Sequence, residues 1–260
     1  MEMQKILQVL EDIAPRELAE DWDNPGLLIG SPYRDVKKIL ICLDVDNRII
    51  DFACENKIDL IISHHPIIFN AIKHIRFDLP LGKRIEKLIR NEIMIFSAHT
   101  NLDAAHGGVN DVLAERLGLT RTEPFAEHLG RIGFVEKISV KDFADRVKEN
   151  LNADHIRLIT ADENRKISKI AVVSGSGADF IDEANDLNAE MFVTSDVRYH
   201  QAQHAFELGL NLIDAGHFYT EFPIVHALSE RLKNIFSQEI FNRSVEIIED
   251  TNGKDFFRAV

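Results

Sequence analysis

Along the chain, short apolar runs alternate with amphipathic stretches in which apolar residues recur with the period of an α-helix. The apolar runs are rich in β-branched residues, which favours buried strands, and the stretches between them favour helices. We expect strands at 38–45, 59–63, 93–99, 156–160, 167–175, 189–195, 210–216 and 243–249. We expect helices at 3–13, 47–57, 82–91, 109–118, 140–152, 178–188, 199–209 and 222–236. Strands that alternate with helices predict an α/β protein with mainly parallel sheets.

Two segments of the chain repeat in the same order. Residues 38–65 align with 169–196 without a gap, and residues 91–103 align with 209–221. The second alignment matches one His-x-x-x-carboxylate sequence with another. We therefore expect two similar α/β domains related by internal duplication. Their expected ranges are 1–124 and 125–260.

Composition and charge narrow the function classes. Among 260 residues there are 30 Lys and Arg against 43 Asp and Glu, so the formal net charge is −13. A nonspecific phosphate-binding groove needs excess Lys and Arg, so we expect no nucleic-acid partner. No apolar run has the length of a membrane-spanning helix, and the N-terminal residues lack the features of a secretory signal. Cys42 and Cys54 lack metal or redox spacing, which favours a reduced, cytoplasmic protein.

Three groups of histidine and carboxylate residues follow expected strands. The groups are SHHP with His64 and His65, SAHTNLD with His99 and Asp103, and AGHFYTE with His217 and Glu221. Open parallel sheets place their ligands at the carboxyl ends of strands, and imidazole with carboxylate suits zinc, iron, manganese or nickel. The three groups together predict a metal site, although a single histidine is usually an ordinary core or surface residue. We interpret as ordinary His74, His106, His128, His155 and His226.

Other residues leave alternatives open. His200 and His204 share one face of an expected helix, where they are either ligands or part of an ordinary amphipathic helix; we favour a substrate-side role for His200. Trp22 either lines the mouth of the site with Asn24 or is buried in packing. The segment VVSGSG (172–177) either binds phosphate through backbone N–H groups or makes a tight turn.

Taken in order, these motifs resemble the Nif-three-like family, also described as GTP cyclohydrolase I type II homologues or dinuclear metal-centre hexameric proteins. The motifs are SHHPIIF, SAHTNLDAAHGGVND, GRIG, VVSGSG and AGHFYTE, and the resemblance runs from DWDNPGLLIG to Glu221. It implies two α/β domains of similar topology, a homohexamer and two divalent metal ions per subunit. The metal ligands that it implies are His64, His65, Asp103, His217 and Glu221, with His99 close to them.

The chain departs from the pattern of this family at one loop. Ser195 stands where the family usually has glycine, which affects how closely the loop approaches a ligand. Some members also carry a further domain between the two halves, and residues 121–168 are too few to hold one. We therefore expect the short form of the family, without the inserted middle domain.

The sequence leaves three alternatives for function. A two-metal site lowers the pKa of a bridging water and polarises the bond that the water attacks, which fits hydrolysis. The resemblance implies a hydrolase for a nucleotide or related small molecule, similar to a GTP cyclohydrolase, with His99 or His200 as the proton shuttle. The second alternative is a non-enzymatic metal-binding oligomer that stores or senses metal or presents a surface to a partner. The third is an α/β protein without metal, since a fold does not fix a function.

Overall fold

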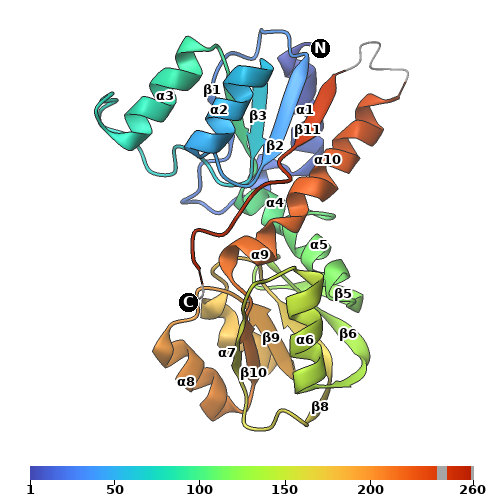
Figure 1. The fold of residues 1–260 in the computed structure, drawn as a ribbon. Helices are drawn as coiled ribbons and strands as arrows, with labels where there is room; N and C mark the ends of the chain where they lie inside the picture. Colours follow the sequence, from blue (N-terminus) through green and yellow to red (C-terminus); the bar gives the residue numbers. More distant parts are fainter. Residues whose placement is uncertain (239–244, 259–260) are drawn as a thin grey trace. The chain divides into compact units, whose positions relative to one another are not determined.

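Residues 1–238 and 245–258 are described by the structure, a computed structural model (Figure 1). The chain divides into two units, and each unit is built around one β-sheet. The first unit contains Met1–His106 and the described part of 224–253, and the second contains Gly107–Pro223 and 254–258. Two sheets with helices between their strands confirm the predicted α/β class.

The units have other bounds than the expected halves 1–124 and 125–260. Helix α5 (Val109–Arg116) packs in the core of the second unit. Strand β11 (Glu246–Glu249) pairs with β2 (Lys38–Cys42) in the first unit. These contacts join segments far apart in the chain, and a sequence repeat does not reveal them. The ranges 1–124 and 125–260 stay a prediction about the internal duplication, whereas the two units describe which segments pack together.

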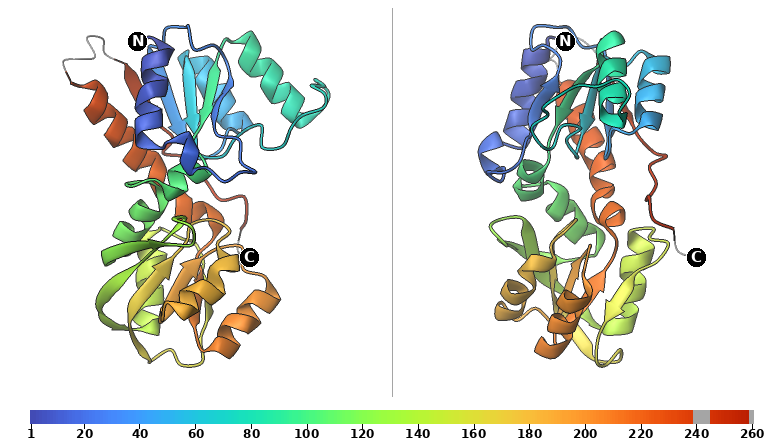
Figure 2. Two further views of the ribbon diagram at one scale, coloured as in Figure 1. Left: turned by 180° about the vertical axis from the view of Figure 1, so that it is seen from behind. Right: turned by 90° about the vertical axis from the view of Figure 1, so that its left-hand side faces the viewer.

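The sheet of the first unit has the strand order β1-β4-β3-β2-β11. Its other strands are β1 (Gly26–Ile29), β3 (Leu60–Ser63) and β4 (Met94–Ser97). Neighbours are parallel except β1, which runs antiparallel to β4. Helices α2 (Asn47–Asn56) and α3 (Pro80–Arg90) cover one face, and α1 (Met3–Ile13) lies on the other (Figure 2). The remaining helices are η1 (Arg16–Leu18), α4 (Thr100–Ala104) and α10 (Pro223–Phe236), whose first residue belongs to the second unit.

The sheet of the second unit has the order β5-β6-β8-β9-β10-β7. Its strands are β5 (Thr120–Phe125), β6 (Gly130–Ser139), β7 (Arg157–Ile159), β8 (Lys166–Val172), β9 (Met191–Thr194) and β10 (Asn211–Asp214). The central strands β8, β9 and β10 are parallel, and the outer strands pair antiparallel. Besides α5, the helices are α6 (Val140–Asn150), η2 (Ala178–Phe180), α7 (Ile181–Asp186), α8 (Tyr199–Leu208) and α9 (His217–Glu221). Helices α5, α6 and α9 pack on one face, and α7 and α8 on the other.

The predicted duplication is confirmed by the strand order and register. The order β1-β4-β3-β2 of the first unit matches β7-β10-β9-β8 of the second, with the same strand directions. Ile39 pairs with Leu60, and Ile170 pairs with Met191, as the gap-free alignment requires. Between the repeated parts, the chain forms β5, β6 and α6, which belong to the second unit.

A carboxylate in each unit accepts hydrogen bonds from the backbone at equivalent positions of β2 and β8. Asp59 Oδ2 accepts the N–H groups of Lys37 and Lys38, at 2.7 and 2.9 Å. Glu190 Oε2 accepts the N–H groups of Ser168 and Lys169, at 2.7 and 3.1 Å. Burial raises the pKa of Glu190, but these hydrogen bonds outweigh it and lower the pKa below its ordinary value. The two units therefore share the strands and also the carboxylates that accept hydrogen bonds from them.

Some strands differ from the sequence-based expectation. Strands β1, β5 and β6 lie in segments for which the sequence predicts no strand. Strand β1 is short and half-buried, and β5 is almost wholly exposed, so neither shows the burial of the predicted strands. The expected strand 243–249 is described from Glu246 onward, and 243–244 lie outside the described residues. None of the helices in the described ranges combines the length and hydrophobicity that a membrane-spanning segment needs.

Candidate metal centre

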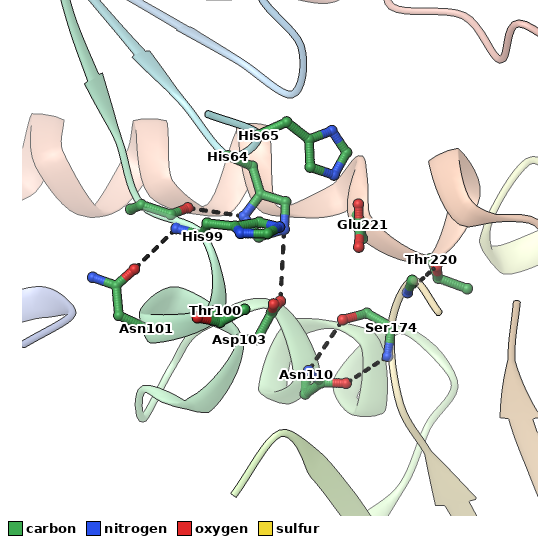
Figure 3. A network of polar contacts seen from close by, with 12 residues as sticks. His64, His65, His99, Thr100, Asn101, Asp103, Asn110, Ser174, Thr220 and Glu221 are labelled. Carbon is green, nitrogen blue, oxygen red and sulfur yellow. Dashed lines mark hydrogen bonds and ion pairs between the residues drawn. The ribbon is translucent and has the colours of Figure 1, made fainter. Parts of the chain in front are cut away.

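In the first unit, four of the predicted site residues lie at the carboxyl ends of β3 and β4 (Figure 3). One ring nitrogen from each of His64, His65 and His99 lies within 4.8 Å of the others. His64 Nε2 also lies 3.6 Å from Asp103 Oδ1 on α4. Because β3 and β4 are parallel neighbours, the residues that follow them meet at the same edge of the sheet. The strand-end reasoning is therefore supported for these four residues.

The three histidines share one feature, an oxygen atom next to Nδ1. The acceptors are the carbonyl of Ala98 for His64 (2.9 Å), the carboxylate of Asp44 for His65 (2.8 Å) and the carboxylate of Asp23 for His99 (2.8 Å). An oxygen acceptor requires the ring proton on Nδ1 and places the lone pair on Nε2. Metal-binding histidines are commonly held in this way. The arrangement orients three imidazoles for coordination through Nε2.

Asp23 fixes the backbone around His99 as well as its ring. Its fully buried carboxylate accepts hydrogen bonds from His99 Nδ1, from the N–H of Thr100 (3.0 Å) and from Thr100 Oγ1 (2.6 Å). Burial raises the pKa of Asp23, but the hydrogen bonds from His99 and Thr100 outweigh it and lower the pKa to about 2. Asp23 is thus ionised at neutral pH and holds His99 at the start of α4.

In the second unit, the two predicted ligands lie on successive turns of α9. His217 Nε2 is 3.1 Å from Glu221 Oε2, and His217 Nδ1 is 2.8 Å from Asp196 Oδ2. Burial lowers the pKa of His217, but the two carboxylates outweigh it and raise the pKa to about 11. An imidazole between two carboxylates marks a place where a cation is favoured. Imidazole and carboxylate are donors that suit a divalent metal.

The glycine loop after β8 packs against this part of the second unit. Gly175 has a φ of +58°, and a Cβ there would collide with the carboxylate of Glu221, so glycine permits the close approach. The N–H groups of the loop donate to side-chain oxygens: Ser174 to Asn110, Gly175 to Thr220 and Gly177 to Thr194. These bonds occupy the N–H groups of three of the four loop residues 174–177. They favour the tight-turn alternative for VVSGSG, and phosphate binding stays an untested alternative.

The departure from the family pattern at Ser195 has a structural explanation. Ser195 is fully buried, and its N–H donates to the carbonyl of Gly175 at 3.0 Å. The left-handed backbone conformation falls on the next residue, Asp196, whose φ is 56°. Ser195 therefore does not need the freedom of glycine. The residue with the strained backbone is Asp196, which accepts the hydrogen bond from His217. Residues in functional sites often have strained backbone conformations.

His200 and His204 do not join the candidate donors of the second unit. His200 is exposed on α8, where its ring contacts that of Tyr199. His204 Nε2 lies 2.6 Å from Asp182 Oδ1. Among the residues that the structure describes, no metal-compatible group contains either histidine. The substrate-side role of His200 stays a prediction.

Trp22 lies beside His99 rather than in the core. The side chain is 59% exposed, and its ring centroid is 6.2 Å from that of His99. The neighbouring Asn24 donates from Nδ2 to the carbonyl of Ile68 at 2.7 Å. The alternative of buried packing for Trp22 is therefore wrong.

A further metal-compatible group lies beside the end of the edge strand β11 in the first unit. It consists of His226, Glu230 and Glu249. Lys233 Nζ lies 2.9 Å from Glu230 Oε1 and 3.9 Å from Glu249 Oε2. A lysine ammonium already balances these two carboxylates, so we assign no metal here.

Sequence reasoning missed the aspartates that orient the histidines. Asp44 follows β2, and Asp196 is the residue that aligns with His65 in the repeat. Asp23 lies in DWDN, far from His99 in the sequence. The same rule that selected the strand-end histidines selects Asp44 and Asp196, whereas Asp23 is found only through the fold.

Comparison with known proteins covers the whole chain. The family model described as Duf34/NIF3 (NGG1p interacting factor 3) matches residues 1–253. A GTP cyclohydrolase 1 type 2 homolog of Clostridium perfringens is 37% identical over an alignment 268 residues long, which covers 100% of this chain and 100% of that protein. A solved structure of a Bacillus cereus protein related to NIF3 has a TM-score of 0.92 at 27% identity and covers 98% of each chain. A hypothetical protein of Staphylococcus aureus has a TM-score of 0.93 at 29% identity, covering 100% of this chain and 99% of its own.

Proposed function

Because the chain belongs to the Duf34/NIF3 family, which confirms the resemblance seen in its motifs, we propose that it is a metal-dependent hydrolase of a nucleotide or a related small molecule. The observation that carries the proposal is the shared orientation of His64, His65 and His99, whose Nδ1 atoms each contact an oxygen. This leaves Nε2 for metal coordination in His64 and His65 and for proton transfer in His99.

We assign two divalent metal ions to each chain, as the family resemblance implies. The proposed ligands are His64, His65 and Asp103 in the first unit and His217 and Glu221 in the second. A pair of such ions supplies a water of lowered pKa and polarises the bond under attack. The donors are nitrogen and oxygen, so zinc, iron, manganese and nickel all fit.

The chain's own residues supply orientation and proton transfer. Asp44 holds the ring of His65, and Asp196 holds the ring of His217. His99 carries a proton on Nδ1 toward Asp23, which leaves Nε2 to accept a proton from a reacting group. We propose His99 as the proton shuttle, with His200 as the second candidate.

The substrate class rests on the relatives' names. Those in Clostridium perfringens and Clostridium acetobutylicum, 37% and 35% identical, are called GTP cyclohydrolase 1 type 2 homologs. We propose the same class of chemistry, hydrolytic opening of a nucleotide ring, for this chain. We also propose a homohexamer, which light scattering tests; a monomer mass would contradict it.

Turnover that depends on metal is the test of this proposal. The protein is stripped with a chelator, reloaded with each metal in turn, and assayed with GTP and other nucleotides. We expect activity to rise with metal content and to be lost in His65→Ala. The matched control is His74→Ala, since His74 is exposed in the same unit. Metal binding without turnover would favour the non-enzymatic store or sensor, and no metal binding would contradict both.

A further inference from the structure

Trp22 and Phe69 form an exposed aromatic pair beside His99 in the first unit. Their ring centroids are 5.7 Å apart, and they lie 6.2 and 6.0 Å from the ring of His99. Trp22 is 59% exposed and Phe69 is 46% exposed. Leaving two large aromatic rings in water forgoes the free energy of burying them. Exposed aromatic rings next to candidate ligands are typical of a binding surface.

Part-buried hydrogen bonds fix the backbone segments that carry the two rings. The carboxylate of Asp23 bonds the start of α4, which fixes the backbone that carries Trp22. Asn24 donates to the carbonyl of Ile68, the residue before Phe69. The N–H of Glu20 donates to Thr100 Oγ1 at 3.0 Å, on the other side of Trp22. The pair is therefore preorganised, which reduces the entropy lost when a ligand binds.

We propose that Trp22 and Phe69 stack on the planar heteroaromatic ring of the substrate and hold it beside His99. This inference rests on the proposed function and specifies which part of the substrate the first unit recognises. Aromatic side chains stack on any base, because every base has a π-face. The segment EDWDN (20–24) has three carboxylates and no cation, so it does not favour phosphate. The ring, rather than the phosphates, is thus the recognised part.

Fluorescence tests this inference directly, because Trp22 is the only tryptophan in the sequence. Guanosine is titrated into the protein with ribose as the non-aromatic control, in both chelated and metal-loaded samples. We expect saturable quenching by guanosine and none by ribose. Phe69→Leu should weaken guanosine binding by roughly fivefold or more, since stacking on an aromatic ring is lost. Phe206→Leu is the matched control, because Phe206 is 51% exposed on α8 of the second unit.

Each other outcome contradicts one proposal and not the other. Quenching that does not saturate, or that Phe69→Leu leaves unchanged, would overturn the stacking role even in protein that binds metal. If acrylamide does not quench Trp22 in the protein without guanosine, another surface, such as a second copy of the chain, covers Trp22. This result would also overturn the stacking role. Guanosine binding in protein that takes up no metal would support the stacking role and contradict the proposed function.

Discussion

In the first unit, the second residue after β3 is His65; in the second unit, the equivalent residue after β9 is Asp196. His65 is a candidate ligand whose ring is held by Asp44. Asp196 instead accepts a hydrogen bond from His217. The same backbone position therefore carries a proposed ligand in one unit and a positioning residue in the other. Duplication preserved the strand ends and not the chemistry placed on them.

The connection after the third strand of the repeat also differs between the units. Ser97 ends β4 and Asp214 ends β10, and they pair with equivalent residues of β3 and β9. His99 comes two residues after Ser97, whereas His217 comes three residues after Asp214. The expected alignment of 91–103 with 209–221 therefore matches the histidines and is one residue out of register in the strands. The sheet fixes the strand ends, and the loop that follows accepts an extra residue.

The largest expected effect comes from the equivalent core positions Ile61 and Phe192, which are both fully buried. Ile61→Ala should lower the free energy of unfolding by about 2–5 kcal/mol and Phe192→Ala by about 3–5 kcal/mol, because each leaves a cavity. Denaturant unfolding measures both. The exposed control Phe206→Ala should change the value by less than about 0.5 kcal/mol. An effect of that small size at either core position would contradict the equivalent packing of the two sheets.

The next effect concerns metal binding by the second unit. Glu221→Gln removes the carboxylate 3.1 Å from His217 Nε2 and should abolish most of the metal-induced stabilisation at that site. At a metal concentration a hundred times the dissociation constant, this stabilisation is about 2.7 kcal/mol per site. Thermal melting of chelated and metal-loaded protein measures it. Glu207→Gln, at an exposed position of α8, is the matched control. Full retention of the metal-induced shift by Glu221→Gln would show that Glu221 is not a ligand.

A smaller effect separates the positioning carboxylates of the two units. Asp44→Asn and Asp196→Asn keep the side-chain size and weaken the acceptor at Nδ1 of His65 and His217. We expect metal affinity to fall roughly tenfold in each variant, as for other carboxylates that hold a metal-binding histidine. Competition with a chromophoric chelator measures the affinity. The control is Asp182→Asn, beside His204. A loss confined to Asp44→Asn would contradict metal binding by His217 in the second unit.

The smallest effect is a pH dependence of stability in the second unit. The pKa of Glu190 is lowered in the folded protein, so its stabilising contribution is complete above the ordinary pKa of glutamate and is lost as the pH falls through the folded-state pKa. Glu190→Gln should therefore flatten the acid side of a plot of melting temperature against pH. An unchanged acid side in this variant would show that the hydrogen bonds to Ser168 and Lys169 do not contribute.

The elements with a strong periodic pattern were predictable from the sequence. Helix α1 has the expected bounds 3–13, because its apolar residues recur on one face and become buried. Strand β3 is fully buried and lies within one residue of the expected 59–63. The predicted donors followed from the same strands, since a strand end in a parallel sheet is a known place for ligands.

Features that depend on long-range pairing were not predictable in this way. Strand β5 is almost wholly exposed, so no apolar alternation marks it, and only its pairing with β6 makes it a strand. Asp23 approaches His99 across 76 positions of the sequence. The exposure of Trp22 likewise follows from tertiary packing, because the sequence alone does not distinguish an aromatic residue of the core from one in a binding site.

Elemental analysis of the purified, metal-reconstituted protein tests the central claim most directly, namely that strand-end donors in both units bind divalent metal. After gel filtration we expect about two equivalents of zinc, iron, manganese or nickel per chain, as in other two-metal sites. The same measurement on Glu221→Gln and on His65→Ala should give a lower content in each. A wild-type metal content no higher than that of the buffer would contradict the account.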